Sequence, residues 1–260
     1  MNSQDKNWEN LFGHITTSGV AWHGIWTVYS PEKEVLNSFK GIRKFQANEE
    51  KTLITQTNKY TNSDGIESEK IWQIQKQICS QPDGVIHPAF LSMTALSFGG
   101  DKNAWVSKKL EAGKKFGTEL FFRYQDWRTS VSSIYAESGD LEKITIIQEH
   151  LNSFANQPAK AKIEKLSGWS GRKEYMNSDL SISVAENQEF VLEPTERKNY
   201  PIYLPDNVTV NVPKKVNLGE EFEIVAGKLV TTNEYQTLTV QYDNSGAFAM
   251  LTSEVFTLQD

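Results

Sequence analysis

Aromatic residues and one arginine recur at positions that β-strands would bring together. Trp22 and Trp26 alternate with polar residues in a run from Ala21 to Tyr29, and this alternation places both rings on one face of a strand. If such faces line the interior of a closed barrel, they form an aromatic-walled pocket with an arginine near its rim. The candidate ligand-binding residues are Trp22, Trp26, Trp72, Phe121, Arg128 and Tyr135.

A pocket of this kind indicates the chemistry of its ligand. An apolar cavity with a few polar groups suits a small hydrophobic molecule, and an arginine pairs in bidentate fashion with a carboxylate. The alternative is core packing, in which the two tryptophans plug the floor of a barrel and Arg128 only caps it by hydrogen bonding. Both interpretations remain open from the sequence.

Other site chemistry finds little support. The four histidines have no spacing that puts two metal ligands on one element. The segment Gly168 to Gly171 is one residue short of a nucleophile elbow and precedes no helix. Cys79 closes a predicted strand and is interpreted as a packed structural thiol. No catalytic residue, metal site or cofactor is therefore predicted, and an enzyme is the less favoured class.

Composition limits the partners. The chain has 260 residues, a formal net charge of −6 and a sequence pI near 5.4. Without a dense basic face, a nucleic-acid partner is not expected. No apolar run approaches the length of a membrane span, and the polar start does not resemble a secretory signal. With its single cysteine, the chain is expected to be cytoplasmic.

One basic segment stands apart from this acidic average. Lys108 to Lys115 carries four lysines around Gly113 and is predicted to form a hairpin tip. Lysines at such a tip can block edge-to-edge pairing of strands. An anionic partner is the alternative interpretation.

Short alternating runs separated by turn signals predict an all-β fold. One helix is expected at the front, because Trp8, Leu11, Phe12 and Ile15 follow helical spacing, and it would close one end of a barrel. The predicted strands are Ala21–Tyr29, Phe39–Phe45, Thr52–Tyr60, Glu69–Ile78, Gly117–Tyr124, Ser130–Ala136, Lys143–Glu149, Trp169–Tyr175, Leu180–Val184, Glu189–Leu192, Val208–Val212, Phe222–Leu229, Gln236–Tyr242 and Phe248–Phe256.

Three signatures occur twice in the same order and indicate an internal duplication. Trp22-His23-Gly24 corresponds to Trp169-Ser170-Gly171, and Tyr135 to Gly139 corresponds to Tyr242 to Gly246. Pro82-Asp83-Gly84-Val85 similarly corresponds to Pro205-Asp206-Asn207-Val208. We therefore expect two tandem antiparallel barrels, residues 1–152 and a shorter 163–260, joined by a linker at 153–162. The longer first copy is the better candidate for an open cavity.

Several of these segments resemble a known family. The chain is similar to two-domain lipocalin-like (calycin) proteins of cyanobacteria and plants, to which no activity is assigned. The residues that carry the resemblance are Trp8 to Leu11, Trp22 to Trp26, Tyr29 to Pro31, Tyr203 to Asp206, Gly219 to Phe222 and Tyr242 to Phe248.

The resemblance implies a fold and offers two alternatives to a carrier. Proteins related by fold include fatty-acid carriers and lyases that attach bilin pigments, so a bilin lyase or chaperone is one alternative. The other is a structural or protein-interaction module with two filled barrels. In the family pattern, arginines precede the tyrosine of each late hairpin. This chain keeps Arg128 before Tyr135 but has Gln236, Thr237 and Gln241 before Tyr242, so any role of these arginines is lost from the second barrel.

Overall fold

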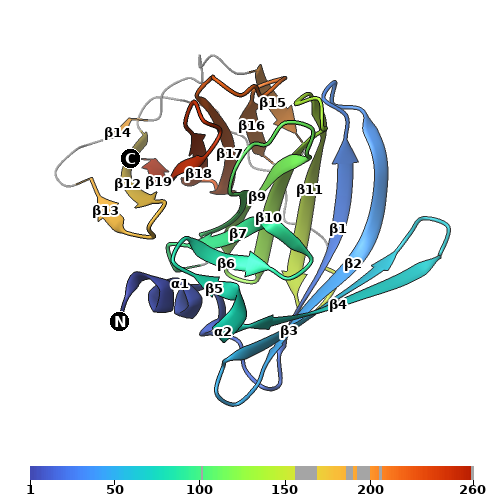
Figure 1. Cartoon of the computed structure of the whole chain (residues 1–260). Helices are drawn as coiled ribbons and strands as arrows, with labels where there is room; N and C mark the ends of the chain where they lie inside the picture. The colour runs from blue at the N-terminus through green and yellow to red at the C-terminus, as the bar shows by residue number, and fades with distance from the viewer. Residues whose placement is uncertain (101, 156–168, 186–189, 192–199, 205–206, 259–260) are drawn as a thin grey trace.

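The chain folds into two antiparallel β-sheets with a short N-terminal helix (Figure 1). The computed structural model describes residues 1–100, 102–155, 169–185, 190–191, 200–204 and 207–258. The predicted all-β class is confirmed, and the first sheet is nearly closed into a barrel. No helix of these described residues is long and apolar enough to cross a membrane.

The first sheet contains the strands of the N-terminal half. They are β1 (Val20–Tyr29), β2 (Val35–Ala47), β3 (Leu53–Thr61), β4 (Glu67–Gln75), β5 (Ser80–Gln81), β6 (Gly84–His87), β7 (Phe90–Ser97), β8 (Asn103–Ser107), β9 (Phe116–Tyr124), β10 (Trp127–Tyr135) and β11 (Leu141–Leu151). Their order is β4-β3-β2-β1-β11-β10-β9-β8-β7-β6-β5, so the first long strand pairs with the last one.

The second sheet contains the strands of the C-terminal half. They are β12 (Trp169–Asn177), β13 (Ile182–Val184), β14 (Phe190–Val191), β15 (Tyr200–Leu204), β16 (Val208–Val212), β17 (Phe222–Thr231), β18 (Glu234–Tyr242) and β19 (Phe248–Leu258). They follow the order β13-β12-β19-β18-β17-β16-β15, with β14 beside β12. The early strand β12 again pairs with the last strand, as β1 does with β11.

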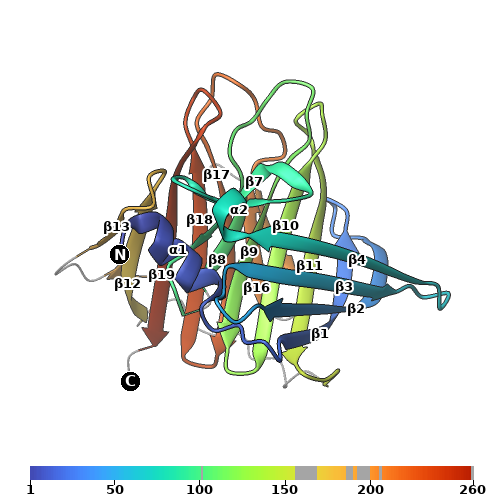
Figure 2. The same ribbon diagram turned by 60° about the horizontal axis from the view of Figure 1, so that its bottom comes forward.

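The N-terminal helix α1 (Ser3–Phe12) covers the end of the first sheet near β5, β6 and β7 (Figure 2). The four residues with helical spacing are all buried, and they pack with Ile54, Ile74 and Val85. Asn7 fixes the helix to β7, because its amide donates to the Ala95 carbonyl at 3.1 Å and accepts from the Ser97 N–H at 2.8 Å. The predicted helix and its contact with the barrel are thus present.

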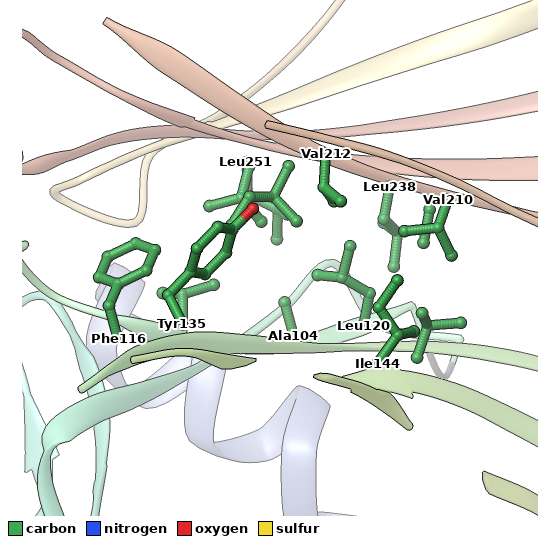
Figure 3. Packing of buried hydrophobic residues seen from close by; sticks show 14 of the residues in the cluster. Ala104, Phe116, Leu120, Tyr135, Ile144, Val210, Val212, Leu238 and Leu251 are labelled. Atoms are coloured by element: carbon green, nitrogen blue, oxygen red, sulfur yellow. The ribbon is translucent and has the colours of Figure 1, made fainter. Parts of the chain in front are cut away.

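The two sheets share one hydrophobic core. Figure 3 shows Ala104, Leu120 and Ile144 of the first sheet facing Val210 and Leu238 of the second. All five side chains are buried. Successive side chains of a strand point to opposite faces of its sheet. The first sheet therefore has two faces: an apolar outer face that packs on the second sheet, and an inner face that lines the interior of the barrel.

Reciprocal contacts tie each half to the other. The Tyr135 hydroxyl donates to the Pro213 carbonyl, and the Tyr242 hydroxyl donates to the Ser107 carbonyl, each at 3.0 Å. Lys109 forms a β-bridge with Ala247. The corresponding bridge joins Asp140 to Lys215. These matching contacts agree with the duplication that the sequence predicts.

Some strand boundaries differ from the sequence prediction. The expected strand Glu69–Ile78 ends at Gln75, where the short helix α2 (Lys76–Cys79) begins. Strands β5, β6, β7, β8 and β15 were not predicted; in β7 the reason is a continuous buried run, Thr94–Ser97, without alternation. Strand β11 ends at Leu151 and β12 begins at Trp169. The predicted linker at 153–162 lies outside the described residues from position 156 onward, so the division into 1–152 and 163–260 stays a prediction.

Candidate functional site

The inner face of the first sheet encloses a cavity of about 450 Å³. Its wall is rich in aromatic rings and has polar groups at several depths. The residues that line it are Trp26, Arg43, Gln56, Asn58, Tyr60, Lys70, Trp72, His87, Phe90, Ser92, Met93, Trp105, Ser107, Lys115, Phe116, Gly117, Glu119, Ser132, Ile134 and Ile147. This size lies in the range of small-molecule sites, roughly 300–1,000 Å³.

Trp26 forms one aromatic wall of this cavity. Its ring stacks on Phe39 at 5.9 Å between centroids and meets Tyr60 edge-on at 5.8 Å. The ring lies directly over Gly41, where an added Cβ would collide with it. The absence of a side chain at Gly41 thus leaves room for the Trp26 ring, and a larger residue at position 41 would displace that ring.

His87 stands in a second aromatic group of the wall. Its ring lies 5.3 Å from Trp72, 5.0 Å from Phe90 and 5.1 Å from Trp105. Its Nδ1 accepts a hydrogen bond from the Ala89 N–H at 3.1 Å, which places the ring proton of the neutral form on Nε2. Burial lowers the pKa of His87 to about 4. Near pH 7 the imidazole is therefore uncharged.

The lowered pKa of His87 predicts a pH-dependent stability. Between about 4 and the ordinary value of 6.5 the unfolded chain binds the proton that the folded chain excludes, so stability falls as pH falls through this window. From pH 7 to pH 5 this residue should cost about 2 kcal/mol of unfolding free energy. We expect the His87→Gln variant to lose that part of the pH dependence in urea titrations. A ring signal of His87 that titrates near 6.5 by NMR would contradict the prediction.

Two arginines and two glutamates form a buried ion network inside the barrel. Arg43 pairs with Glu119 at 2.8 Å and with Glu149 at 3.1 Å, and Arg128 pairs with Glu149 at 2.7 Å. The Ser130 hydroxyl donates to Glu119 at 2.7 Å. The Glu149 side chain has no solvent exposure. The four charges alternate along this network and cancel.

Burial and the neighbouring charges shift the pKa values of three groups in the network in opposite directions. Burial by itself lowers the pKa of Arg43, but the charges of Glu119 and Glu149 outweigh burial and raise it. Burial raises the pKa of Glu119, but Arg43, the Ser130 hydroxyl and Arg128 together outweigh burial, so the pKa is lowered. Burial lowers the pKa of Arg128 despite Glu149. The glutamate and the arginines are thus charged at neutral pH.

Aromatic rings cover the arginine planes. The Arg128 guanidinium lies 4.5 Å from the centroid of Trp22 and 5.5 Å from Phe121. The Arg43 guanidinium lies 5.2 Å from Trp26 and 5.6 Å from Phe121. Cation–π contacts of this kind strengthen when water is excluded. They hold both arginines in fixed positions beside the cavity.

Barrel closure brings the network together. Arg128 lies opposite Glu149 in the β10–β11 pairing, and Gly24 of β1 lies opposite Glu149 on the other side. An added Cβ at Gly24 would collide with the Gln148 carbonyl and the Glu149 side chain. The glycine of the Trp22-His23-Gly24 signature thus allows β11 to approach β1 closely, with Glu149 turned inward.

The structure brings five of the six predicted site residues to the inner face. Trp26 and Trp72 line the cavity itself. Trp22, Phe121 and Arg128 line a smaller space of about 70 Å³, which shares Arg43, Gln56 and Trp105 with the main cavity. Tyr135 lies on the outer face, in the core between the sheets, so the structure does not bring it to the cavity.

Sequence reasoning missed the partners of Arg128. Arg43, Glu119 and Glu149 lie in β2, β9 and β11, and none of them was singled out as a candidate site residue. One signal was available for the first two: Arg43 is two residues from Phe45 on β2, and Glu119 is two residues from Phe121 on β9, so each shares a face with an inward aromatic ring. Strand β11 has no aromatic ring of this kind beside Glu149.

The second half has apolar residues at the equivalent positions. In the β18–β19 pairing Tyr235 lies opposite Phe256, as Arg128 lies opposite Glu149 in the first half. Tyr235 and Phe256 belong to a buried cluster with Trp169 and Leu229. The second copy thus keeps the strand register but has no counterpart of the Arg128–Glu149 pair at this place.

The fold and the site define a β-barrel protein with an internal cavity and a buried ion network. Residues 4–154, more than half of the chain, match the family described as domain of unknown function (DUF3598), N-terminal. The chain belongs to the DUF3598 family. Residues 123–255 also match a family described as biogenesis factor required for ATP synthase 1, C-terminal domain.

One solved structure has the same fold. The chain is similar to a DUF3598-family protein of unknown function from Nostoc punctiforme, with 18% identity, a TM-score of 0.73, and coverage of 97% of this chain and 98% of that one. At this identity the likeness shows the fold alone. An intact transferrin-binding protein B with both lobes, 9% identical over 94% of this chain and 49% of that one, has a TM-score of only 0.24 and carries no argument. No curated protein matches the chain.

Proposed function

We propose that the first barrel is a lipocalin-like carrier that binds a small hydrophobic, carboxylated ligand in its internal cavity. The observation that carries the proposal is the cavity of about 450 Å³ between Trp26, Trp72 and Trp105. Rings on several sides offer apolar contact area to a flat or fatty molecule, and fixed aromatic side chains lose little conformational entropy on binding. The ion network beside the cavity keeps these walls in place.

The proposal is tested by native mass spectrometry of freshly purified protein beside a denatured sample, with an absorbance scan from the near-ultraviolet to the red. Extra mass that is lost on denaturation supports the carrier function, and a visible band would identify a pigment such as a bilin or haem. The empty protein is then titrated with hydrophobic carboxylates. A bare mass together with no binding of any such probe would overturn the proposal.

Trp72 provides a matched test of the cavity. It lines the cavity and is only partly buried, so Trp72→Ala should fold and lose apolar contact with the ligand. We expect the variant to bind a hydrophobic probe about 10-fold more weakly, since a good aromatic contact contributes about 1.5 kcal/mol. The control is Trp127→Ala, because Trp127 is also partly buried but packs on His150 outside the cavity. Equal losses in both variants would contradict a site in the cavity.

A second candidate is a protein-interaction module that acts in assembly. It rests on the match of residues 123–255 to the domain described as belonging to a biogenesis factor required for ATP synthase. The two candidates differ in a direct measurement. An assembly module should bind isolated ATP synthase subunits with the cavity empty, whereas a carrier should bind its small ligand without them.

A further inference from the structure

The charges along the cavity wall differ between its inner part and its mouth. Three cations and one carboxylate line the cavity: Arg43, Lys70, Lys115 and Glu119. Arg43 and Glu119 are buried or largely buried, with side-chain exposures of 7% and 20%, whereas Lys70 and Lys115 are exposed. The inner charges belong to the neutral network described above. The positive charge outside this network is therefore at the mouth, on Lys70 and on Lys115, which pairs with Glu142.

The inner part is poorly suited to a carboxylate. Arg43 already pairs with both Glu119 and Glu149, and Arg128 pairs with Glu149. A ligand carboxylate beside Arg43 would be a third anion next to two arginines, with Glu119 on the same cavity wall. Excess negative charge in a buried site is costly, because water screens it little.

Uncharged hydrogen-bonding groups are available in the inner part instead. The Gln56 amide donates to Asn58 at 3.1 Å, and the Asn58 amide donates to the Tyr60 hydroxyl at 2.8 Å, so these residues form a chain along β3. These groups suit a carbonyl, hydroxyl or amide on the inner end of a ligand.

The mouth offers cations beside exposed apolar surface. Lys115 is well exposed and pairs with the half-buried Glu142 at 2.9 Å, and the exposed Lys70 side chain makes no ion pair among the described residues. Phe90 lines the cavity and is 53% exposed. A carboxylate at this place stays hydrated while it gains the attraction of two lysines.

We propose that the ligand enters with its apolar or uncharged end first and keeps its carboxylate at the mouth, beside Lys70 and Lys115. This inference rests on the proposed carrier function and specifies the ligand as an amphipathic acid in a fixed orientation. Arg43 and Arg128 then hold the barrel interior together and do not recognise the acid. Lys115 is the last lysine of the basic segment Lys108 to Lys115, which connects β8 to β9. In this orientation the segment takes part in binding the ligand carboxylate.

The test compares acids with their methyl esters. Fluorescence titrations with cis-parinaric acid, a flexible carboxylate, and 1-pyrenebutyric acid, a flat one, are run beside the ester of each probe. The wild-type protein should bind at least one acid about 3- to 10-fold more tightly than its ester, as expected for two exposed charge pairs. The double variant Lys70→Met with Lys115→Met should bind acid and ester equally well. Lys59→Met is the control, because Lys59 is exposed but does not line the cavity.

The outcomes separate the orientation from the carrier function. If neither acid nor ester binds, both the carrier function and this inference fail. If both bind and the double variant keeps the preference for the acid, the cavity is a binding site but the orientation is wrong. An ester that binds the wild-type protein as tightly as its acid also overturns the orientation. Loss of acid preference in the double variant alone, with ester affinity unchanged, supports the inference.

Discussion

The Glu149→Gln variant is expected to lose about 3–5 kcal/mol of unfolding free energy, because it removes the carboxylate that joins two buried arginines. Glu149 pairs with Arg43 at 3.1 Å and with Arg128 at 2.7 Å, and its side chain is fully buried. Glutamine keeps the shape but leaves a net positive charge in the barrel interior. Urea denaturation followed by circular dichroism measures the difference.

Two comparisons make this result specific. Glu69→Gln removes the same charge from the Lys59–Glu69 pair, whose members are 64% and 43% exposed, and should change stability by less than about 1 kcal/mol. Adding Arg128→Gln to Glu149→Gln restores the charge balance, so the double variant should be more stable than Glu149→Gln alone. A loss below about 1 kcal/mol for Glu149→Gln would contradict the prediction and mean that water solvates the unpaired arginine charge.

Truncation of Tyr242 should destabilise both halves of the chain together. Its ring is buried between the sheets, 4.8 Å from Phe116 of the first half and 4.8 Å from Phe222 of the second. We expect Tyr242→Ala to cost about 3–5 kcal/mol, the usual range for a buried aromatic side chain. Six of the seven tryptophans precede residue 130, so tryptophan fluorescence follows mainly the first half, whereas circular dichroism follows both sheets. We expect the two methods to give the same single unfolding transition.

The controls separate the ring of Tyr242 from its hydroxyl. Tyr242→Phe removes only the hydrogen bond to the Ser107 carbonyl and should cost about 1–2 kcal/mol. Tyr124→Ala removes a side chain that is 39% exposed and should cost less than Tyr242→Ala. Two separate transitions, with only the second half destabilised, would show that the sheets unfold independently.

Local periodicity predicted much of the first barrel. The alternation from Trp22 to Trp26 placed both rings on one face of β1, without saying whether that face is inward, and the spacing of Trp8 and Leu11 indicated the helix. Tyr135 is the candidate site residue that the structure places on the opposite face from the cavity. It is seven residues from Arg128 on the same strand, and an odd separation sends two side chains to opposite faces.

The ion network depends on contacts that no local pattern contains. Arg43 lies 76 residues from Glu119 in the chain, and their ion pair forms only because the inner faces of β2 and β9 meet across the barrel. A sequence pattern assigns a residue to a face, but barrel closure and register determine which residue lies opposite. This is why Arg128 could be predicted as a site residue while its partner carboxylate could not.

The reciprocal contacts between the halves have the form of an isologous interface, which normally joins two subunits across a twofold axis. Lys109 bridges to Ala247 as Lys215 bridges to Asp140, and each late tyrosine donates to the backbone of the other half. The chain is in this sense a dimer within one polypeptide, and its covalent connection acts by raising the effective concentration of one half around the other. Because the interface now joins two different copies, one of them is free to fill its interior with Tyr235 and Phe256 while the other retains a cavity.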